Sequence, residues 1–441
     1  MNQQNPNALE KLLKSLSNVE PREIRSVAAS FLFVFTLMAA WYILRPVRDQ
    51  MASDWSDTEV AFLWNINFFV SAAVVALYGF AVSRIQFRIL VPTVYAFFGL
   101  SFVAFYFLTT GMSDTVLVDK IFYVWVSVFS LFHVSVFWSF MSDLYTKEQS
   151  NRLFSIIAVG ASAGALVGPL LPALFATNLG IDTLLLIAAV ALTIPIGLSL
   201  YLERLKILDL HNEDVNADLT AAKIGGNPFA GFKMFVSNPY LLAIGAFILL
   251  YTAIGSFVYF EQKNLLAPLE PEIRTMYLAR VDLITNILTF ITGFFITGRI
   301  VANFGMAVTL ALVPVFIVAG LLILAFSPIL IVVLALQVAR RAGNYAITRP
   351  AREMLFTAVD RETRFKAKPV IDIVVYRGGD AVSGSLFAAL TDGLGFGLAA
   401  MAGIGAGIAA VWAAVGAYLG RMFGRKEESA SQAGDIARQQ A

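Results

Sequence analysis

Apolar runs of about 20 residues recur from residue 26 to residue 420, separated by short polar or Gly/Pro-rich segments. A helix of about 20 apolar residues crosses the hydrocarbon core of a bilayer, so each run predicts one membrane span. The predicted fold is an all-α membrane protein with 12 transmembrane helices. Spans nine and ten are separated only by a tight turn at Ser327 and Pro328, so a total that differs from 12 by one helix stays open. The predicted spans are 26–44, 59–82, 89–110, 119–141, 153–176, 181–202, 240–260, 277–302, 306–326, 328–348, 369–392 and 395–420.

Polar segments divide this pattern into two sets of six spans. Six plus six spans around a polar linker is typical of transporters whose pseudo-twofold-related halves rock about a midplane site. Within the linker, Asn227 and Pro228 precede FAGFKMF, which predicts a short amphipathic helix on the inner surface; a plain tether is the alternative. The predicted parts are an N-terminal segment (1–25), a first half (26–202), a linker (203–239), a second half (240–420) and a tail (421–441).

Lys and Arg residues are unevenly distributed between the two sides that this layout implies. Of 32 such residues, 23 lie in or next to the N-terminal segment, the even-numbered loops and the tail, six lie in or next to the segments on the opposite side, and three lie deep inside apolar runs. Because cytoplasmic loops retain positive charge, we predict that both termini are cytoplasmic. We expect no signal or transit peptide.

The composition argues against a soluble protein. The chain of 441 residues is 58% hydrophobic and 14% charged, whereas soluble domains usually contain about 25% charged residues. It contains no Cys and two His, so we expect no disulfide framework and no Cys/His metal site. A Walker-type phosphate-binding sequence is also absent. We therefore expect no enzyme activity, cofactor or nucleic-acid partner.

Charged residues inside the predicted spans are the main candidates for a binding site, because each is costly in lipid. The eleventh span, IDIVVYRGGDAVSGS, places Arg377 and Asp380 on one helical face near the midplane. The tenth span, LQVARRAGNYAITRP, contains Arg340 and Arg341 without an acid nearby, which favours an anionic ligand. The alternatives are a self-neutralising Arg377–Asp380 pair, and pairing of the two arginines with Asp282 or Asp380 or snorkelling to an interface.

The first span ends in WYILRPVRDQM, in which Arg45 and Asp49 share a face and Arg48 lies between them. A kink at Pro46 would turn these guanidiniums towards a central cavity, where their planar forks suit phosphate or carboxylate. Anchoring at the membrane interface is the alternative.

Three further features of the sequence are informative. Two of them are single residues with two interpretations each, and the third is a glycine pattern that concerns helix packing. Asp282 predicts either ion coupling or helix pairing. His133 predicts either a proton acceptor or a hydrogen bond between helices. Gly160, Gly164 and Gly168 repeat every four residues in span five and predict close helix packing.

Four segments resemble the major facilitator superfamily and, within it, the ATP/ADP translocase family of bacteria and plastids. The resemblance implies exchange of ATP for ADP or related nucleotides, with phosphates held by cations at the end of span one and on span eleven. Arg48 is similar to a family Lys, and Glu261 to a family Glu in span seven. Asp380 departs from the family pattern, which has a Lys there. The segments are YILRPVRD, FWSFMSDLYTKEQSNRLFSIIAVGASAGALVGP, GGNPFAGFKMFVSNPYLL and ITRPAREMLFTAVDRETRFKAKPVIDIVVYRGGD.

These patterns together predict a secondary transporter of the bacterial inner (plasma) membrane that exchanges a small anionic metabolite, ATP or ADP among the candidates. Alternating access would not require an oligomer. Two alternatives stay open at this point. One is a proton-coupled exporter in which Asp380, Asp282 or His133 titrates, and the other is a transport-inactive scaffold or sensor.

Overall fold

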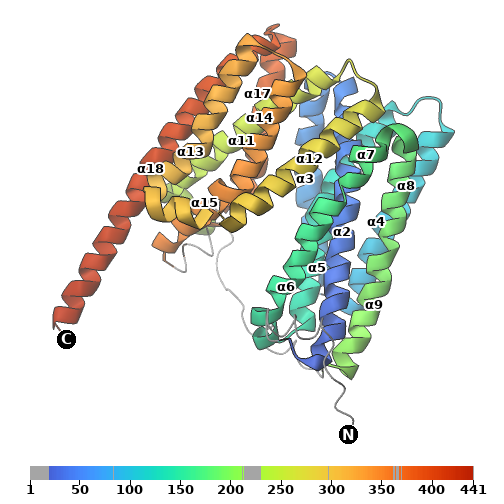
Figure 1. Ribbon diagram of the computed structural model, residues 1–441, viewed down its shortest axis with the longest axis horizontal. Helices are drawn as coiled ribbons and strands as arrows, with labels where there is room; N and C mark the ends of the chain where they lie inside the picture. The colour runs from blue at the N-terminus through green and yellow to red at the C-terminus, as the bar shows by residue number, and fades with distance from the viewer. Residues whose placement is uncertain are drawn as a thin grey trace. The chain divides into compact units, whose positions relative to one another are not determined.

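The computed structural model describes residues 19–82, 84–210, 212, 230–295, 297–360, 363, 367–368 and 370–440 (Figure 1). All regular structure in these ranges is helical, which confirms the predicted fold class. Ten helices of this described part are long and apolar enough to span a membrane. Predicted spans eight and eleven are not among these ten helices. Span eight corresponds to α12 (Pro271–Phe295), and span eleven corresponds to η6 (Val370–Val375), α17 (Tyr376–Ala388) and η7 (Ala389–Gly393) in succession.

The helices form two compact units. Unit 1 comprises residues 1–51, 69–224 and 270–283. Its long helix α2 (Ile24–Met51) continues unbroken through Pro46 and packs against α5, α6, α8 and α9. The other helices of unit 1 are η1 (Pro21–Glu23), α4 (Phe87–Gly111), α5 (Val116–Leu144), α6 (Lys147–Val167), α7 (Leu170–Leu179), α8 (Ile181–Ala191) and α9 (Thr193–Leu208).

Unit 2 comprises residues 52–68, 225–269 and 284–441. Here α11 (Pro239–Leu266) packs against α14, α17 and α18, and α13 runs along α18 (Figure 1). The other helices of unit 2 are η2 (Ala52–Asp54), α10 (Ala230–Ser237), α13 (Thr297–Phe326), α14 (Leu330–Gly343), η4 (Asn344–Thr348), α15 (Arg349–Leu355), η5 (Phe356–Ala358), η6, α17, η7 and α18 (Leu398–Gln440).

The compact units differ from the two halves expected from the sequence at two helices. The first residues of α3 (Asp57–Val82) belong to unit 2, and the first residues of α12 belong to unit 1. In the predicted linker, α10 covers much of the expected amphipathic helix, whereas Asn227 and Pro228 lie outside the described residues.

Local sequence signals explain several helix ends. Thr146 accepts a hydrogen bond from the backbone of Gln149, whose side chain in turn accepts one from the Thr146 backbone, and this capping box starts α6. Asn238 caps α11, where Pro239 occupies the first helical position. Gly305 adopts φ +72°, a left-handed conformation that bends α13 at the predicted turn between spans eight and nine.

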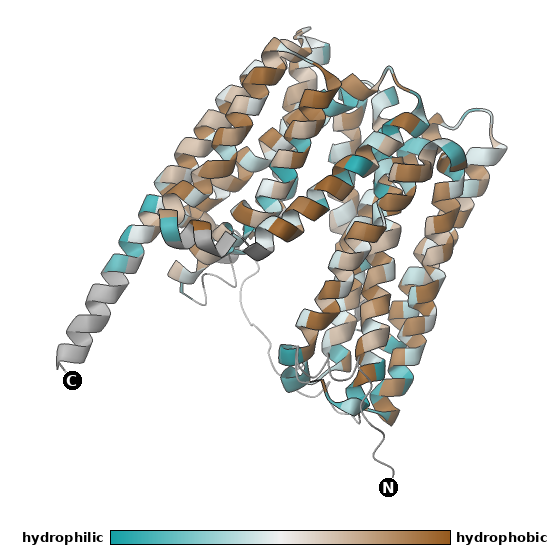
Figure 2. Ribbon diagram, viewed as in Figure 1, coloured by the Kyte–Doolittle hydropathy of each residue, from teal (hydrophilic) through white to brown (hydrophobic). Residues whose placement is uncertain are grey.

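The distribution of hydropathy agrees with membrane insertion. Figure 2 shows helices that are mainly hydrophobic along their lengths, with hydrophilic residues concentrated at helix ends and in connecting segments. Many large apolar side chains are exposed, among them Phe69, Leu100 and Phe316. Such exposure suits a lipid environment rather than water.

Candidate functional site

Arg340, near the C-terminal end of α14, is a buried cation with neutral contacts. Its side chain donates to the Gln337 Oε1 at 3.0 Å from Nε and 2.7 Å from one terminal nitrogen. The other terminal nitrogen lies 3.5 Å from the Tyr251 hydroxyl, and Arg340 is only 8% exposed. Among the residues that the structure describes, no carboxylate lies within ion-pair distance of Arg340. Such a charge is costly unless an anion joins it.

Arg377 and Asp380 lie one turn apart on α17 and are both partly exposed. Their side chains make no hydrogen bond or ion pair with each other or with other described residues. Tyr376, next to Arg377 on the same helix, lies beside Tyr251, whose hydroxyl is 3.5 Å from Arg340. The segment of α17 that carries Arg377 and Asp380 therefore packs close to Arg340 within unit 2.

Aromatic hydroxyls surround these charges. The ring of Tyr251 on α11 lies 6.1 Å from that of Tyr376 on α17, measured between ring centres. The guanidinium carbon of Arg340 lies 5.8 Å from the centre of the Tyr251 ring. This region of unit 2 thus offers cations, hydroxyl groups and aromatic faces from α11, α14 and α17.

A π-helical turn lies next to each set of arginines. η4 starts directly after α14, which carries Arg340 and Arg341, and η6 ends directly before α17, which carries Arg377. A π turn contains more residues per turn than an α-helix and shifts the direction of the side chains around it, and such turns are frequent at functional sites. No signal in the sequence indicated these turns.

Arg45 and Arg48, near the C-terminal end of α2, are, in contrast, in contact with acids. Arg45 lies 3.3 Å from Asp282 and 3.6 Å from Asp49. Arg48 donates to the Asp49 Oδ1 at 2.6 Å and to the Ser127 hydroxyl at 3.2 Å. Two cations and two carboxylates thus balance each other. The structure also gives Asp282 the helix-pairing contact that was one of its two interpretations.

Unit 2 also contains a buried ion pair between two helices. Lys263, near the end of α11, lies 2.8 Å from Asp57 at the start of α3 and donates to the Trp55 carbonyl at 2.6 Å. Asp57 also accepts a hydrogen bond from Thr391 at 2.8 Å. Both charged side chains are almost fully buried. Sequence reasoning missed this pair because both residues lie at the ends of predicted spans.

His133 and Glu261 are buried without a matching polar partner. The ring of His133 stacks on Trp41, with 5.1 Å between ring centres, and its Nδ1 has no hydrogen-bond partner in the described part of the chain. Glu261, on α11, is 0% exposed, and neither carboxylate oxygen has a hydrogen-bond partner there.

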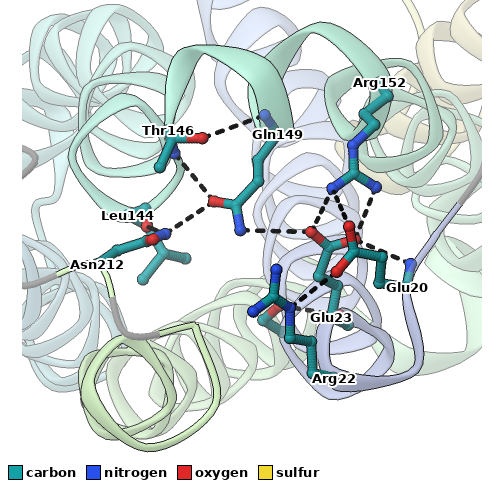
Figure 3. A network of polar contacts seen from close by, with 9 residues as sticks. Glu20, Arg22, Glu23, Leu144, Thr146, Gln149, Arg152 and Asn212 are labelled. Carbon is teal, nitrogen blue, oxygen red and sulfur yellow. Dashed lines mark hydrogen bonds and ion pairs between the residues drawn. The ribbon is translucent and has the colours of Figure 1, made fainter.

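A polar network fastens one end of unit 1 (Figure 3). Arg152 of α6 donates to both carboxylate oxygens of the fully buried Glu23, at 2.6 and 2.8 Å. Gln149 also donates to Glu23 and accepts from Asn212, at 3.3 and 2.7 Å. The network joins η1, α6 and the segment after α9. Here the buried charge is paired, unlike Arg340.

Comparison with known protein families identifies the family of this chain. A model described as "Major Facilitator Superfamily" matches residues 30–352. The chain belongs to the Major Facilitator Superfamily. A search of curated protein sequences finds no match to it.

Several solved structures share the fold of this superfamily member. A bacterial homologue of the human lysosomal transporter Spinster, inward-facing and unoccupied, is 15% identical, with a TM-score of 0.58 over 92% of this chain and 99% of that one. The nucleoside transporter NupG is 12% identical, with a TM-score of 0.64 over 91% and 99%. An inward-facing bacterial homologue of the iron transporter ferroportin is 13% identical, with a TM-score of 0.62 over 91% and 100%. Superfamily membership and the shared fold place the chain among membrane transporters.

In this superfamily member, the three glycines of span five lie against α2. A Cβ atom at any of them would lie closer than 3.0 Å to a backbone oxygen of α2, so the two helix backbones are in close approach. The pairs are Gly160 with Phe31, Gly164 with Phe35, and Gly168 with Ala39.

We expect Gly164→Leu to prevent assembly of the transporter or to lower its unfolding temperature strongly. Overpacking usually costs about 1–3 kcal/mol, and here the opposing atoms are backbone and cannot rotate away. Gly197→Leu on α9 is the matched control, because nothing lies within 4 Å of a Cβ there. Size-exclusion profiles and thermal unfolding of the purified proteins measure the difference. Similar results for both variants would contradict the packing role.

Proposed function

We propose that this protein is a secondary transporter that exchanges small anionic metabolites by alternating access. The observation that carries this proposal is Arg340, a buried cation that contacts only neutral groups among the described residues. Arg340 of α14 and Arg377 of α17 outnumber Asp380, so this region has an excess of positive charge. An anion entering it would supply the missing counter-charge.

The chemistry of the region supports a phosphate or carboxylate group on the substrate. Arginine stays protonated, and its planar fork donates two parallel hydrogen bonds to such groups. Tyr251 and Tyr376 add aromatic surface that suits a nucleobase. We therefore retain ATP, ADP and related nucleotides as proposed substrates, in line with the translocase-like segments.

We further propose that two ion pairs open and close during transport. Arg45–Asp282 and Asp57–Lys263 each join a residue of the first sequence half to a residue of the second. In the layout of two six-span halves, each pair combines the first span of one half with the second span of the other. A rocking movement would have to break both pairs. We place both termini on the cytoplasmic side of a bacterial inner membrane because of the distribution of Lys and Arg.

Reconstitution into proteoliposomes tests the proposed exchange. We expect labelled ATP or ADP, or an anion selected by thermal-shift screening, to enter vesicles preloaded with the same unlabelled compound. A protonophore should change the rate little, because arginines do not release protons at physiological pH. Empty vesicles should take up almost none. Absence of transport by well-folded protein in both kinds of vesicle would favour a scaffold or sensor instead.

Proton-coupled transport is the second candidate, and Glu261 is the observation that favours it. A carrier of protons needs a group that is neutral when buried and ionises when exposed to water. Glu261 is buried with no hydrogen-bond partner among the described residues, whereas Asp282 is paired with Arg45. Gradient-driven uptake into empty vesicles that is lost in Glu261→Gln would support this candidate. Retention of exchange in Glu261→Gln, whose side chain has the same shape and no charge, would exclude it.

A further inference from the structure

Asp380 is an acid in a region that otherwise suits anions. Asp380 lies one turn after Arg377 on α17, yet its carboxylate has no hydrogen bond or ion pair with any residue of the described ranges. A carboxylate that only neutralised Arg377 would be expected within ion-pair distance of it. An unengaged carboxylate would repel a purely anionic substrate.

The position of α17 is fixed by other contacts, so the two charges are not needed to hold it. Ser383 lies 2.8 Å from the Ser256 hydroxyl of α11. A Cβ atom at Gly379 would lie closer than 3.0 Å to Thr252 of the same helix. Close packing on α11 therefore sets the orientation of α17, and Arg377 and Asp380 project from it about 60° apart and about 4.5 Å along the axis. This spacing presents one donor group and one acceptor group to the same ligand.

We infer that the substrate carries both an anionic group for Arg377 and Arg340 and an amino group that donates hydrogen bonds to Asp380. The inference rests on the proposed function, because it assumes that the anion binds in this region. A carboxylate accepts strong, charge-assisted hydrogen bonds from ammonium and amino groups. A phosphate or carboxylate compound that also has an amino group can bind both the arginines and Asp380. A compound with only an anionic group binds the arginines but is repelled by the Asp380 carboxylate.

Two pairs of probes separate the sources of the amino group. O-Phosphoethanolamine and propyl phosphate differ by an ammonium group, and AMP and IMP differ by the exocyclic amine of the base. In equilibrium binding to the purified full chain, we expect the amino member of one pair to bind about tenfold more tightly or better. A preference in the first pair assigns a zwitterion, and a preference in the second assigns an aminated base.

Asp380→Asn provides the matched variant. It should remove the preference for the amino member and should strengthen binding of the other member, because the repulsive charge is gone. Asp114→Asn, in an exposed connecting segment, should leave the preference unchanged. Equal binding within both pairs, or an unchanged preference in Asp380→Asn, would overturn this inference and leave the proposed anion transport intact. Failure of all four probes to bind would also overturn this inference, whereas absence of anion exchange in proteoliposomes would overturn the proposed function.

Discussion

Arg340→Ala is expected to abolish anion binding while leaving the ligand-free protein at least as stable as the wild type. The wild-type guanidinium is buried and contacts Gln337 and Tyr251, which carry no charge. Removing it relieves a desolvation cost and leaves behind no carboxylate that was ion-paired with it among the described residues. The same change removes a charge-assisted donor to the substrate, a loss of about 2–5 kcal/mol, or roughly thirtyfold or more in Kd.

The measurement is the unfolding temperature of detergent-purified protein with and without nucleotides, phosphorylated metabolites and organic anions. Arg152→Ala is the control with the opposite expectation. It leaves the fully buried Glu23 without its main cation, so it should lower the stability of the ligand-free protein and preserve the shift caused by ligand. A strongly destabilised Arg340→Ala protein that still responds to anions would show that Arg340 is structural.

Lys263→Met is expected to destabilise the protein by about 3–5 kcal/mol, because it leaves Asp57 buried without a counter-ion. The wild-type pair is 2.8 Å apart, and Lys263 and Asp57 have side chains only 3% and 5% exposed. Adding Asp57→Asn should restore most of the lost stability, because the amide carries no charge and still accepts a hydrogen bond from Thr391. Thermal unfolding of the two single variants and the double variant gives the coupling energy.

The exposed pair of Arg22 and Glu20 supplies the comparison for this cycle. Their side chains are 57% and 46% exposed, so Arg22→Ala should change stability by less than about 1 kcal/mol. If Lys263→Met is as mild as Arg22→Ala, the Asp57–Lys263 contact does not hold the two helices together. Exchange activity of the double variant then shows whether the pair contributes to the transport cycle.

The sequence by itself determined the helical membrane fold. Runs of about 20 apolar residues leave few alternatives, because in lipid every backbone group must be bonded within the helix. The capping box at Thr146 and the left-handed turn at Gly305 also depend on neighbouring residues, although the sequence analysis did not predict them. The every-fourth spacing of Gly164 and Gly168 likewise indicated a close helix contact without indicating which helix supplies it.

The sequence also nominated charged residues, but their electrostatic state depended on tertiary structure. Arg45 and Arg340 look alike along the chain, as arginines within or beside apolar runs. In the structure, Arg45 contacts Asp282, far away in the sequence, whereas Arg340 contacts only Gln337 and Tyr251 among the described residues. Periodicity along one helix cannot report which side chain another helix brings within 4 Å.

The burial of Glu261 likewise depends on tertiary structure. It lies near the end of an apolar run, where a charged residue ordinarily reaches water or a headgroup, and only packing around α11 excludes it from both. Tertiary structure also revealed the π turns beside the arginines. It further placed the first residues of α3 in unit 2 and the first residues of α12 in unit 1. Local sequence sets which segments are helical, because hydrogen bonds within a helix are local. Contacts between helices set which charges are compensated, because the partners come from distant parts of the chain.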